Sequence, residues 1–424
     1  MRTRLRASSP PGFGLRPVLL GLLVPLAVAG GCKWTDFDDL EEDTWVTSTG
    51  KPDNGAANWG VAIARVTRSG TGGTLAVLGA NEPIYNDVVI GPNGDTNVTG
   101  EVQINRQFFT GNLPIEPLLL SSPAGDEAAL VTGTADSRVT ILRSTGGQVT
   151  QIVVNGTTQQ PNAATYMLPP PGGTPAQILV SQGDTVFGGF FENQPNPPPR
   201  CKFADDMNGA FEIRALGAYR PMGKATDEVL VLSNTGKLMV FDGGTAFLGC
   251  GTVTVQPLAG LVIDTMFTDA ITGSQIMTFE DGADRYALVQ AHSDGNKGHL
   301  GLYKIEAAAI TLVGTARADA GLRSAAIISP AGQSKRFVIA GFPTAIVDGV
   351  AAGQVQVFEV STTTGVSATP AMTLFDAEPE DNQSFGRGVA ALPYNGKSII
   401  AVAADNEVFL YFRTSLYEET REGR

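Results

Sequence analysis

The stretch EVLVLSNTGKLMVF (228–241) joins two short apolar runs through a polar turn at Gly236. Apolar runs on either side of such a turn predict the two antiparallel strands of a hairpin. The pattern recurs clearly in RYALVQAHSDGNKGHLGLY (285–303), RFVIAGFPTAIVDGVAAGQVQVF (336–358) and KSIIAVAADNEVFLYF (397–412), and more faintly in TLAVLGA (74–80), AALVTGTADSRVTIL (128–142) and AQILVSQGDTVFGGF (176–190). The chain therefore repeats one β-rich unit seven times.

A glycine-containing turn precedes each copy, and a further short apolar strand precedes each turn. These glycines are Gly73, Gly125, Gly173, Gly223, Gly282, Gly332 and Gly396, spaced 48 to 64 residues apart. One such meander cannot bury both of its faces, but seven meanders packed face to face around an axis can. The repeat predicts an all-β fold over residues 59–412, a seven-bladed β-propeller of four-stranded antiparallel sheets. A count of six blades, with 74–80 in an incomplete unit, is the alternative.

The amino-acid composition argues against some classes of function. The chain has 424 residues with 42% hydrophobic residues, 51 glycines and 26 prolines, which suits a turn-rich protein with a sizeable core. Its net charge of −13 argues against a nucleic-acid surface, which needs clustered Lys and Arg. Only two histidines and three cysteines are available for metal or nucleophile chemistry.

The N-terminus has the features of an export signal. Residues 1–31 carry four arginines and no acid, and their apolar stretch 17–29 is shorter than the roughly 20 residues that span a bilayer. The sequence VAGGC (28–32) resembles the bacterial lipobox, which implies acylation of Cys32 and, because Lys33 follows, an outer-membrane lipoprotein of the cell envelope. Cleavage after Ala29 is the alternative and would release a secreted soluble protein.

Residues 32–58 are expected to form an acidic stalk, since 33–43 holds six acids. Within it, DTWVTST (43–49) has the alternation of a half-buried strand and is expected to close the ring by joining the last blade. The alternative closing strand is 415–417, in the charged C-terminal tail 413–424.

The last unit, SFGRGVAALPYNGKSIIAVAADNEVFLYF (384–412), resembles the FG-GAP repeat of integrin α-like propellers and bacterial surface proteins. Phe385-Gly386 and Trp59-Gly60 match the opening pair of that repeat, and 353–358 matches its third strand. The resemblance implies a propeller and says little about function.

Metal sites have weak candidates. Repeats of this family often carry a calcium loop, yet only FEDGADR (279–285) gathers three acids, Glu280, Asp281 and Asp284. We expect a solvated hairpin tip there and no cofactor, calcium included. His292 and His299 flank a turn, are expected to face each other, and with Asp294 could supply three metal ligands, although paired polar residues at a hairpin end are the simpler interpretation.

No nucleophile elbow or phosphate loop is present in the sequence. Cys201 and Cys250 are expected to form a disulfide after export, with two buried thiols as the alternative. The expected function is a lipid-anchored, non-catalytic module, on the surface or periplasmic face, that binds a protein or glycan or acts as a scaffold. The alternative is a hydrolase or lyase with carboxylates in the central channel.

Overall fold

Strands alone make up the regular structure of the described chain. The computed structural model describes residues 44–50, 59–66, 73–79, 84–91, 96–103, 118–122, 127–134, 138–145, 148–155, 161–167, 177–190, 200–203, 212–221, 224, 227–242, 254–263, 271–293, 298–306, 309–318, 321–329, 335–376, 378–394 and 397–413. These ranges contain thirty strands and no helix, so the predicted all-β class is confirmed. Among the same residues no helix is long and apolar enough to cross a membrane.

The first four sheets follow one another along the chain, except that one short strand of sheet 3 comes from the segment of sheet 4. Sheet 1 comprises β2 (Trp59–Val66), β3 (Gly73–Gly79), β4 (Ile84–Ile90) and β5 (Thr96–Gln103). Sheet 2 comprises β6 (Leu118–Ser121), β7 (Glu127–Thr134), β8 (Arg138–Thr145) and β9 (Gln148–Asn155). Sheet 3 comprises β10 (Ala163–Met167), β11 (Gln177–Gln182), β12 (Thr185–Phe190), β13 (Arg200–Phe203) and β17 (Thr254–Val255). Sheet 4 comprises β14 (Ile213–Tyr219), β15 (Glu228–Ser233), β16 (Lys237–Asp242) and β18 (Ala259–Val262).

Three more sheets complete the described part of the chain, seven in all. Sheet 5 comprises β19 (Ile271–Asp281), β20 (Asp284–Ser293), β21 (Gly298–Glu306) and β22 (Ala309–Ala318). Sheet 6 comprises β23 (Ser324–Ile328), β24 (Arg336–Phe342), β25 (Gln354–Ser361), β26 (Gly365–Val366) and β27 (Met372–Leu374). Sheet 7 comprises β28 (Gly388–Tyr394), β29 (Lys397–Ala404), β30 (Glu407–Arg413) and β1 (Thr44–Gly50). Neighbouring strands pair antiparallel, apart from the short parallel pair of β13 and β17 within the described residues.

The first apolar run of each repeated copy forms the second strand of its sheet. Each lies between two hydrogen-bonded neighbours and is covered on both faces, so that all six residues of β15 are buried. A strand buried on both faces carries a continuous apolar run, whereas a strand with one wet face alternates. This burial explains why the second strands gave the clearest repeat signal in the sequence.

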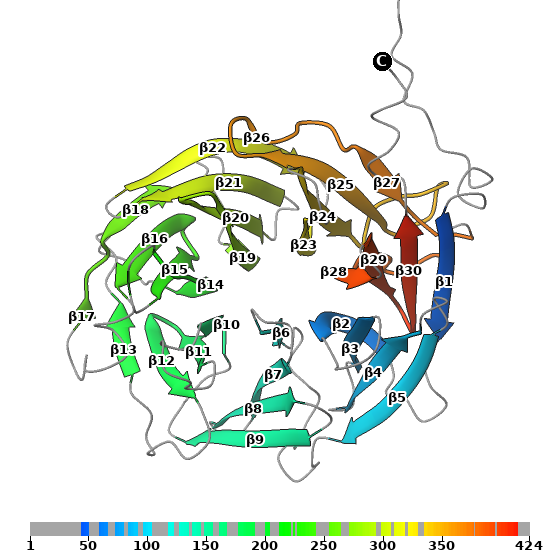
Figure 1. Ribbon diagram of the computed structural model, residues 1–424, viewed down its shortest axis with the longest axis horizontal. Helices are drawn as coiled ribbons and strands as arrows, with labels where there is room; N and C mark the ends of the chain where they lie inside the picture. Colours follow the sequence, from blue (N-terminus) through cyan, green and yellow to red (C-terminus); the bar gives the residue numbers. More distant parts are fainter. Residues whose placement is uncertain are drawn as a thin grey trace, which may run out of the picture.

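The seven sheets lie in a circle around a common centre, with the first strand of each sheet innermost (Figure 1). The innermost strands contact one another in chain order, from β2 through β6, β10, β14, β19 and β23 to β28. Strand β28 in turn contacts β2, so these contacts return to their starting point.

The hydrophobic core of the described residues is divided into seven clusters, each lying between two neighbouring sheets. One of them joins Leu75 and Val77 of sheet 1 to Ala401 and Leu410 of sheet 7. The last sheet therefore packs on the first in the same way as any other neighbouring pair.

The N-terminal strand supplies the outer edge of sheet 7. Strand β1 pairs antiparallel with β30, from Thr44 opposite Arg413 to Gly50 opposite Glu407. Of the two closing strands that the sequence suggested, the N-terminal one is therefore the strand that pairs with β30. The alternative segment 415–417 lies outside the described residues, as do 1–43 and the whole of 414–424.

A tryptophan–glycine pair also joins the first sheet to the last. Trp59 is fully buried, and its carbonyl oxygen accepts a hydrogen bond of 2.8 Å from the backbone nitrogen of Asn406 in sheet 7. Gly60 has a φ of +94°, and a Cβ there would lie 2.6 Å from the carbonyl oxygen of Ala404. Only glycine permits this close approach of the two sheets.

Phe385 and Gly386 make the equivalent junction between sheets 6 and 7. The backbone nitrogen of Phe385 donates to the carbonyl oxygen of Ala352 at 2.8 Å. Gly386 has a φ of +90°, and a Cβ there would lie 2.7 Å from the carbonyl oxygen of Gln354. The two aromatic–glycine pairs noted in the sequence thus occupy matching places at sheet junctions.

Candidate functional site

The FEDGADR segment (279–285) forms the tight hairpin between β19 and β20. Gly282 has a φ of +60°, which suits a glycine in the turn. Antiparallel pairing places Glu280 opposite Arg285 and Asp281 opposite Asp284. The three acids therefore lie at one end of sheet 5, with side chains about half exposed.

Each acid of this hairpin contacts a different basic side chain. A carboxylate oxygen of Glu280 lies 3.1 Å from Nε of Arg285, and one of Asp284 lies 3.0 Å from Nζ of Lys304. Asp281 lies 3.6 Å from Arg336. Among the described residues no three His, Cys, Asp or Glu side chains are grouped as a metal site would require. Each of the three carboxylates is therefore paired with a basic side chain of the protein.

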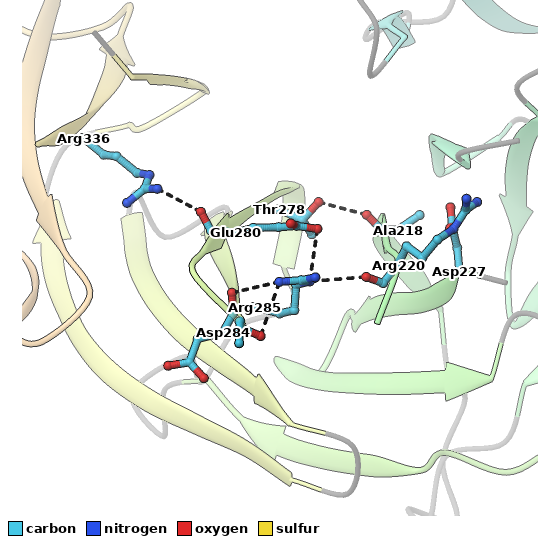
Figure 2. Close-up of polar contacts among 9 residues, drawn as sticks. Ala218, Arg220, Asp227, Thr278, Glu280, Asp284, Arg285 and Arg336 are labelled. Carbon is cyan, nitrogen blue, oxygen red and sulfur yellow. Dashed lines mark hydrogen bonds and ion pairs between the residues drawn. The ribbon is translucent and has the colours of Figure 1, made fainter. Parts of the chain in front are cut away.

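Arg285 links sheet 5 to sheet 4 (Figure 2). Its side chain is 11% exposed, and its Nε donates to the carbonyl oxygen of Arg220 at 3.3 Å as well as facing Glu280. Next to it, Oγ1 of Thr278 donates to the carbonyl oxygen of Ala218 at 2.9 Å. Through Thr278 and Arg285, the β19–β20 hairpin therefore contacts the end of β14.

Two buried carboxylates lie at the same end of sheet 4. Nε of Arg220 lies 2.8 Å from a carboxylate oxygen of Asp227, whose side chain is fully buried. Glu228, also buried, accepts hydrogen bonds from Tyr219 and Lys224. Burial and the bond to Glu228 raise the pKa of the Tyr219 hydroxyl, and the bond to Glu228 raises the pKa of Lys224. Both partners of Glu228 therefore stay protonated at neutral pH.

Arg336 continues the contacts into sheet 6 (Figure 2). One guanidinium nitrogen donates to the carbonyl oxygen of Glu280 at 2.8 Å, and the group lies 4.8 Å from the centre of the Phe279 ring. The Phe279 ring stacks on Tyr286 at 5.4 Å. Asp281 also accepts a hydrogen bond of 3.0 Å from Thr362 of sheet 6.

We name these charged groups the polar seam. It consists of the acids Asp227, Glu228, Glu280, Asp281 and Asp284 and the bases Arg220, Lys224, Arg285, Lys304 and Arg336. Five acids face five bases, and four of these ion pairs lie within one sheet. Neighbouring sheets are joined by the Asp281–Arg336 pair and by the hydrogen bonds of Thr278, Arg285 and Arg336 to backbone carbonyl oxygens. Sequence reasoning identified the three hairpin acids and missed their partners. The spacing of residues along the chain could have indicated these contacts. Arg285 and Arg220 are 65 residues apart and Arg336 and Glu280 are 56 apart, which is about one repeat.

The two histidines do not face each other, which corrects the expectation from the sequence. The register of β20 and β21 places Ala291 opposite His299 and His292 opposite Gly298. Directly paired residues share a face of a sheet, so His292 and His299 lie on opposite faces. Their hydrogen bonds agree with this, because His292 contacts Gln290 at 3.2 Å, whereas His299 contacts Tyr303 at 2.9 Å. Asp294 lies outside the described residues.

Each histidine ring instead packs over a glycine inside the sheet core. A Cβ at Gly273 would lie 2.1 Å from the ring of His292, and one at Gly301 would lie 2.6 Å from that of His299. Both histidines are buried. They act as packing groups on the two faces of sheet 5.

The cysteine predictions fall largely outside the described residues. Cys201 belongs to β13, whose backbone is described. Cys32 and Cys250 lie outside the described ranges, so the proposed acylation and the disulfide stay predictions.

Comparison with known proteins adds no family. A scan against protein-family models finds no match, and a search of curated proteins finds no similar sequence. The resemblance to FG-GAP repeats therefore stays a prediction from the sequence motifs.

Proposed function

We propose that the seven sheets form a β-propeller, tethered to the bacterial outer membrane through acylated Cys32, that serves as a non-catalytic module for binding a protein or glycan, or as a scaffold. The propeller is supported by the closed sequence of contacts among innermost strands and by the core clusters between all neighbouring sheets. Such a ring is a rigid support for loops at its two ends.

The composition of the innermost strands is the observation that favours a binding role. These strands, in the described part of the chain, consist mainly of apolar and small residues, and their acidic residues are Glu280 and Asp281. Both of these acids contact arginines in the polar seam. A hydrolase or lyase would need carboxylates free to act on a substrate in the channel. The inner strands therefore favour a binding module over that alternative.

Membrane attachment is supported by the sequence of the first 32 residues. An arginine-rich start, a short apolar stretch and VAGGC together suit export followed by acylation. Acyl chains at one cysteine are sufficient for stable anchoring when two or more are present.

A cross-linking comparison tests the binding role. A photoreactive residue is placed at exposed Thr344, before β25, or at exposed Thr363, after β25, so that the two probes lie at opposite ends of the ring. In cells that make the full chain, we expect discrete, saturable adducts at one end only. Adducts at neither position would contradict the proposal.

The enzyme alternative is tested in parallel on a panel of polysaccharides. We expect no cleavage by the purified chain. Cleavage that Glu280→Gln abolishes, with the melting temperature unchanged, would overturn the binding role and support the hydrolase or lyase.

A further inference from the structure

Sheet 6 carries an enlarged connection between its second and third strands. Residues 343–353 separate β24 from β25, whereas the same connection is only 183–184 in sheet 3, 234–236 in sheet 4 and 405–406 in sheet 7. This extra segment, which we name the sheet 6 hairpin, projects from the end of the ring opposite the polar seam.

Backbone hydrogen bonds hold the hairpin in one conformation. Val347 and Val350 exchange hydrogen bonds of 2.9 and 3.0 Å around Asp348 and Gly349, whose φ values of 50° and 88° suit a tight two-residue turn. At its base, the backbone nitrogen of Gly353 donates to Ala345 at 2.9 Å.

The segment that enters sheet 7 pairs with the outer arm of the hairpin. The backbone nitrogen of Asn382 donates to the carbonyl oxygen of Ala351 at 3.1 Å, and that of Phe385 donates to Ala352 at 2.8 Å. Ala345 and Val347, in the first arm of the hairpin, are buried. Both arms are therefore fixed before any partner binds.

Ile346 is the feature of this hairpin that its own packing does not explain. Its side chain is 75% exposed, whereas Leu258, Val262 and Leu312, the other exposed large hydrophobic residues of the described chain, are 41–45% exposed. An apolar side chain held out by a pre-ordered backbone loses little conformational entropy when it is buried in a partner.

Acidic side chains lie on the hairpin and on the segment that pairs with it. Asp348 lies at the hairpin tip, and exposed Glu378, Glu380 and Asp381 lie on the adjoining segment. Asp381 contacts the hairpin directly, since its carboxylate accepts a hydrogen bond from the backbone nitrogen of Ala351 at 3.3 Å. In the described part of the chain no basic side chain forms an ion pair with these four acids, in contrast to the five acids of the polar seam.

We propose that the sheet 6 hairpin, with residues 378–381 beside it, is a docking site for a partner protein that offers an apolar pocket bordered by Lys and Arg. This inference rests on the proposed binding role and names its partner. Charge complementarity selects the occupant, because a second copy of this chain would bring the same acids together. Anionic lipid headgroups would be repelled for the same reason.

Selection from a random peptide library tests whether the hairpin prefers apolar and basic sequences. The library is selected on the immobilised soluble chain, residues 33–424, and the enriched consensus peptide is synthesised. We expect a peptide that combines apolar residues with Lys or Arg. Ile346→Ser should weaken its binding by roughly tenfold, as expected for loss of a buried anchor.

Two further variants separate the apolar and ionic parts. Asp348→Asn combined with Glu380→Gln should also weaken binding, and should remove most of its dependence on salt, which screens exposed charges beyond about 10 Å at 0.1 M. Leu312→Ser, on the outer strand β22, is the matched control and should leave the affinity unchanged. All variants should melt like the parent chain, because the replaced side chains are exposed.

Acidic consensus peptides, or equal binding by the Ile346→Ser and Leu312→Ser variants, would overturn the inference. Self-association of the chain that Ile346→Ser abolishes would also overturn it, by assigning the hairpin to a second copy. Adducts at Thr363 but not at Thr344 would leave the binding role standing while excluding this site.

Discussion

Gly60 and Gly386 are positions at which a side chain has no room. Each has a φ near +90°, and a Cβ at either would lie within 2.7 Å of a carbonyl oxygen of an adjoining strand. Backbone conformation and close approach thus both select glycine at the junctions of sheet 7 with its two neighbours.

Gly386→Ala should lower the free energy of unfolding by about 3 kcal/mol or more, because backbone strain of roughly 1–3 kcal/mol adds to the contact with Gln354. Gly183→Ala is the matched control, since Gly183 also has a positive φ of +57° but no atom within 4 Å of its Cβ position. It should cost only about 1–2 kcal/mol. Urea denaturation measures both, and equal losses would show that the sheet junction tolerates a methyl group.

Substitution of the buried carboxylate of Asp227 should cost more stability than substitution of an exposed acid. Asp227→Ala removes the buried carboxylate that lies 2.8 Å from Nε of Arg220, and loss of one member of a buried pair costs about 3 kcal/mol or more. Asp348→Ala, at an exposed acid without an ion pair in the described chain, should change stability by less than about 0.5 kcal/mol. Similar urea midpoints for the two variants would mean that the Arg220–Asp227 pair contributes nothing net.

At the scale of the strand, β1 protects an edge that would otherwise be open. Without it, β30 would present unpaired backbone groups, a feature that invites association with other chains. The strand is separated in sequence from every other member of sheet 7, yet pairs with β30 over its full length.

Deleting residues 43–50 should therefore lower the free energy of unfolding by several kcal/mol, on the order of half the stability of an ordinary domain. The truncated chain should also aggregate more readily, which light scattering detects. Deleting 418–424 is the control and should change little. A chain without 43–50 that melts like the full-length domain would mean that β1 adds no stability.

At the scale of the whole molecule, the ring separates two kinds of end surface. The polar seam lies at one end, where each acid is paired with a basic side chain and hydrogen bonds join sheets 4, 5 and 6. The sheet 6 hairpin lies at the other end and leaves an isoleucine and several acids exposed. In our proposal, the polar seam therefore stabilises one end of the ring and the sheet 6 hairpin binds a partner at the other.

Attachment of the molecule depends on Cys32 in our proposal. The mature protein should partition into detergent, and Cys32→Ala should move it to the aqueous phase, because the acyl chains would supply the anchor. Intact-mass analysis reports the modification directly. An unmodified chain beginning at Gly30 would contradict acylation and support the secreted soluble form.

Local patterns in the sequence were enough to predict the β class and the repeating unit. Apolar runs such as those of β15 and β29 appear in the sequence because strands in the middle of a sheet are buried on both faces. The turn at Gly282 and the glycine of Phe385-Gly386 were also visible, since backbone conformation is a local property. The segment that became β1 was recognisable from its alternation of residue types.

Partners across the sheets were decided only by the tertiary structure. Arg285 and Arg336 lie within their own strands like any other arginine, and their contacts with residues 65 and 56 positions away arise when whole sheets pack. The isoleucine of the sheet 6 hairpin likewise sits in an apolar run, and its exposure follows from the direction in which the hairpin projects.

The histidines show the physical reason most clearly. The sequence placed His292 and His299 on either side of one turn, and a symmetric pairing would have put them on the same face. The register that formed sets His299 opposite Ala291, one residue away from that pairing. Because side chains alternate along a strand, a shift of one residue moves a side chain to the other face. The sequence by itself determined which residues form strands and turns, whereas the register and packing of those strands decided which side chains meet.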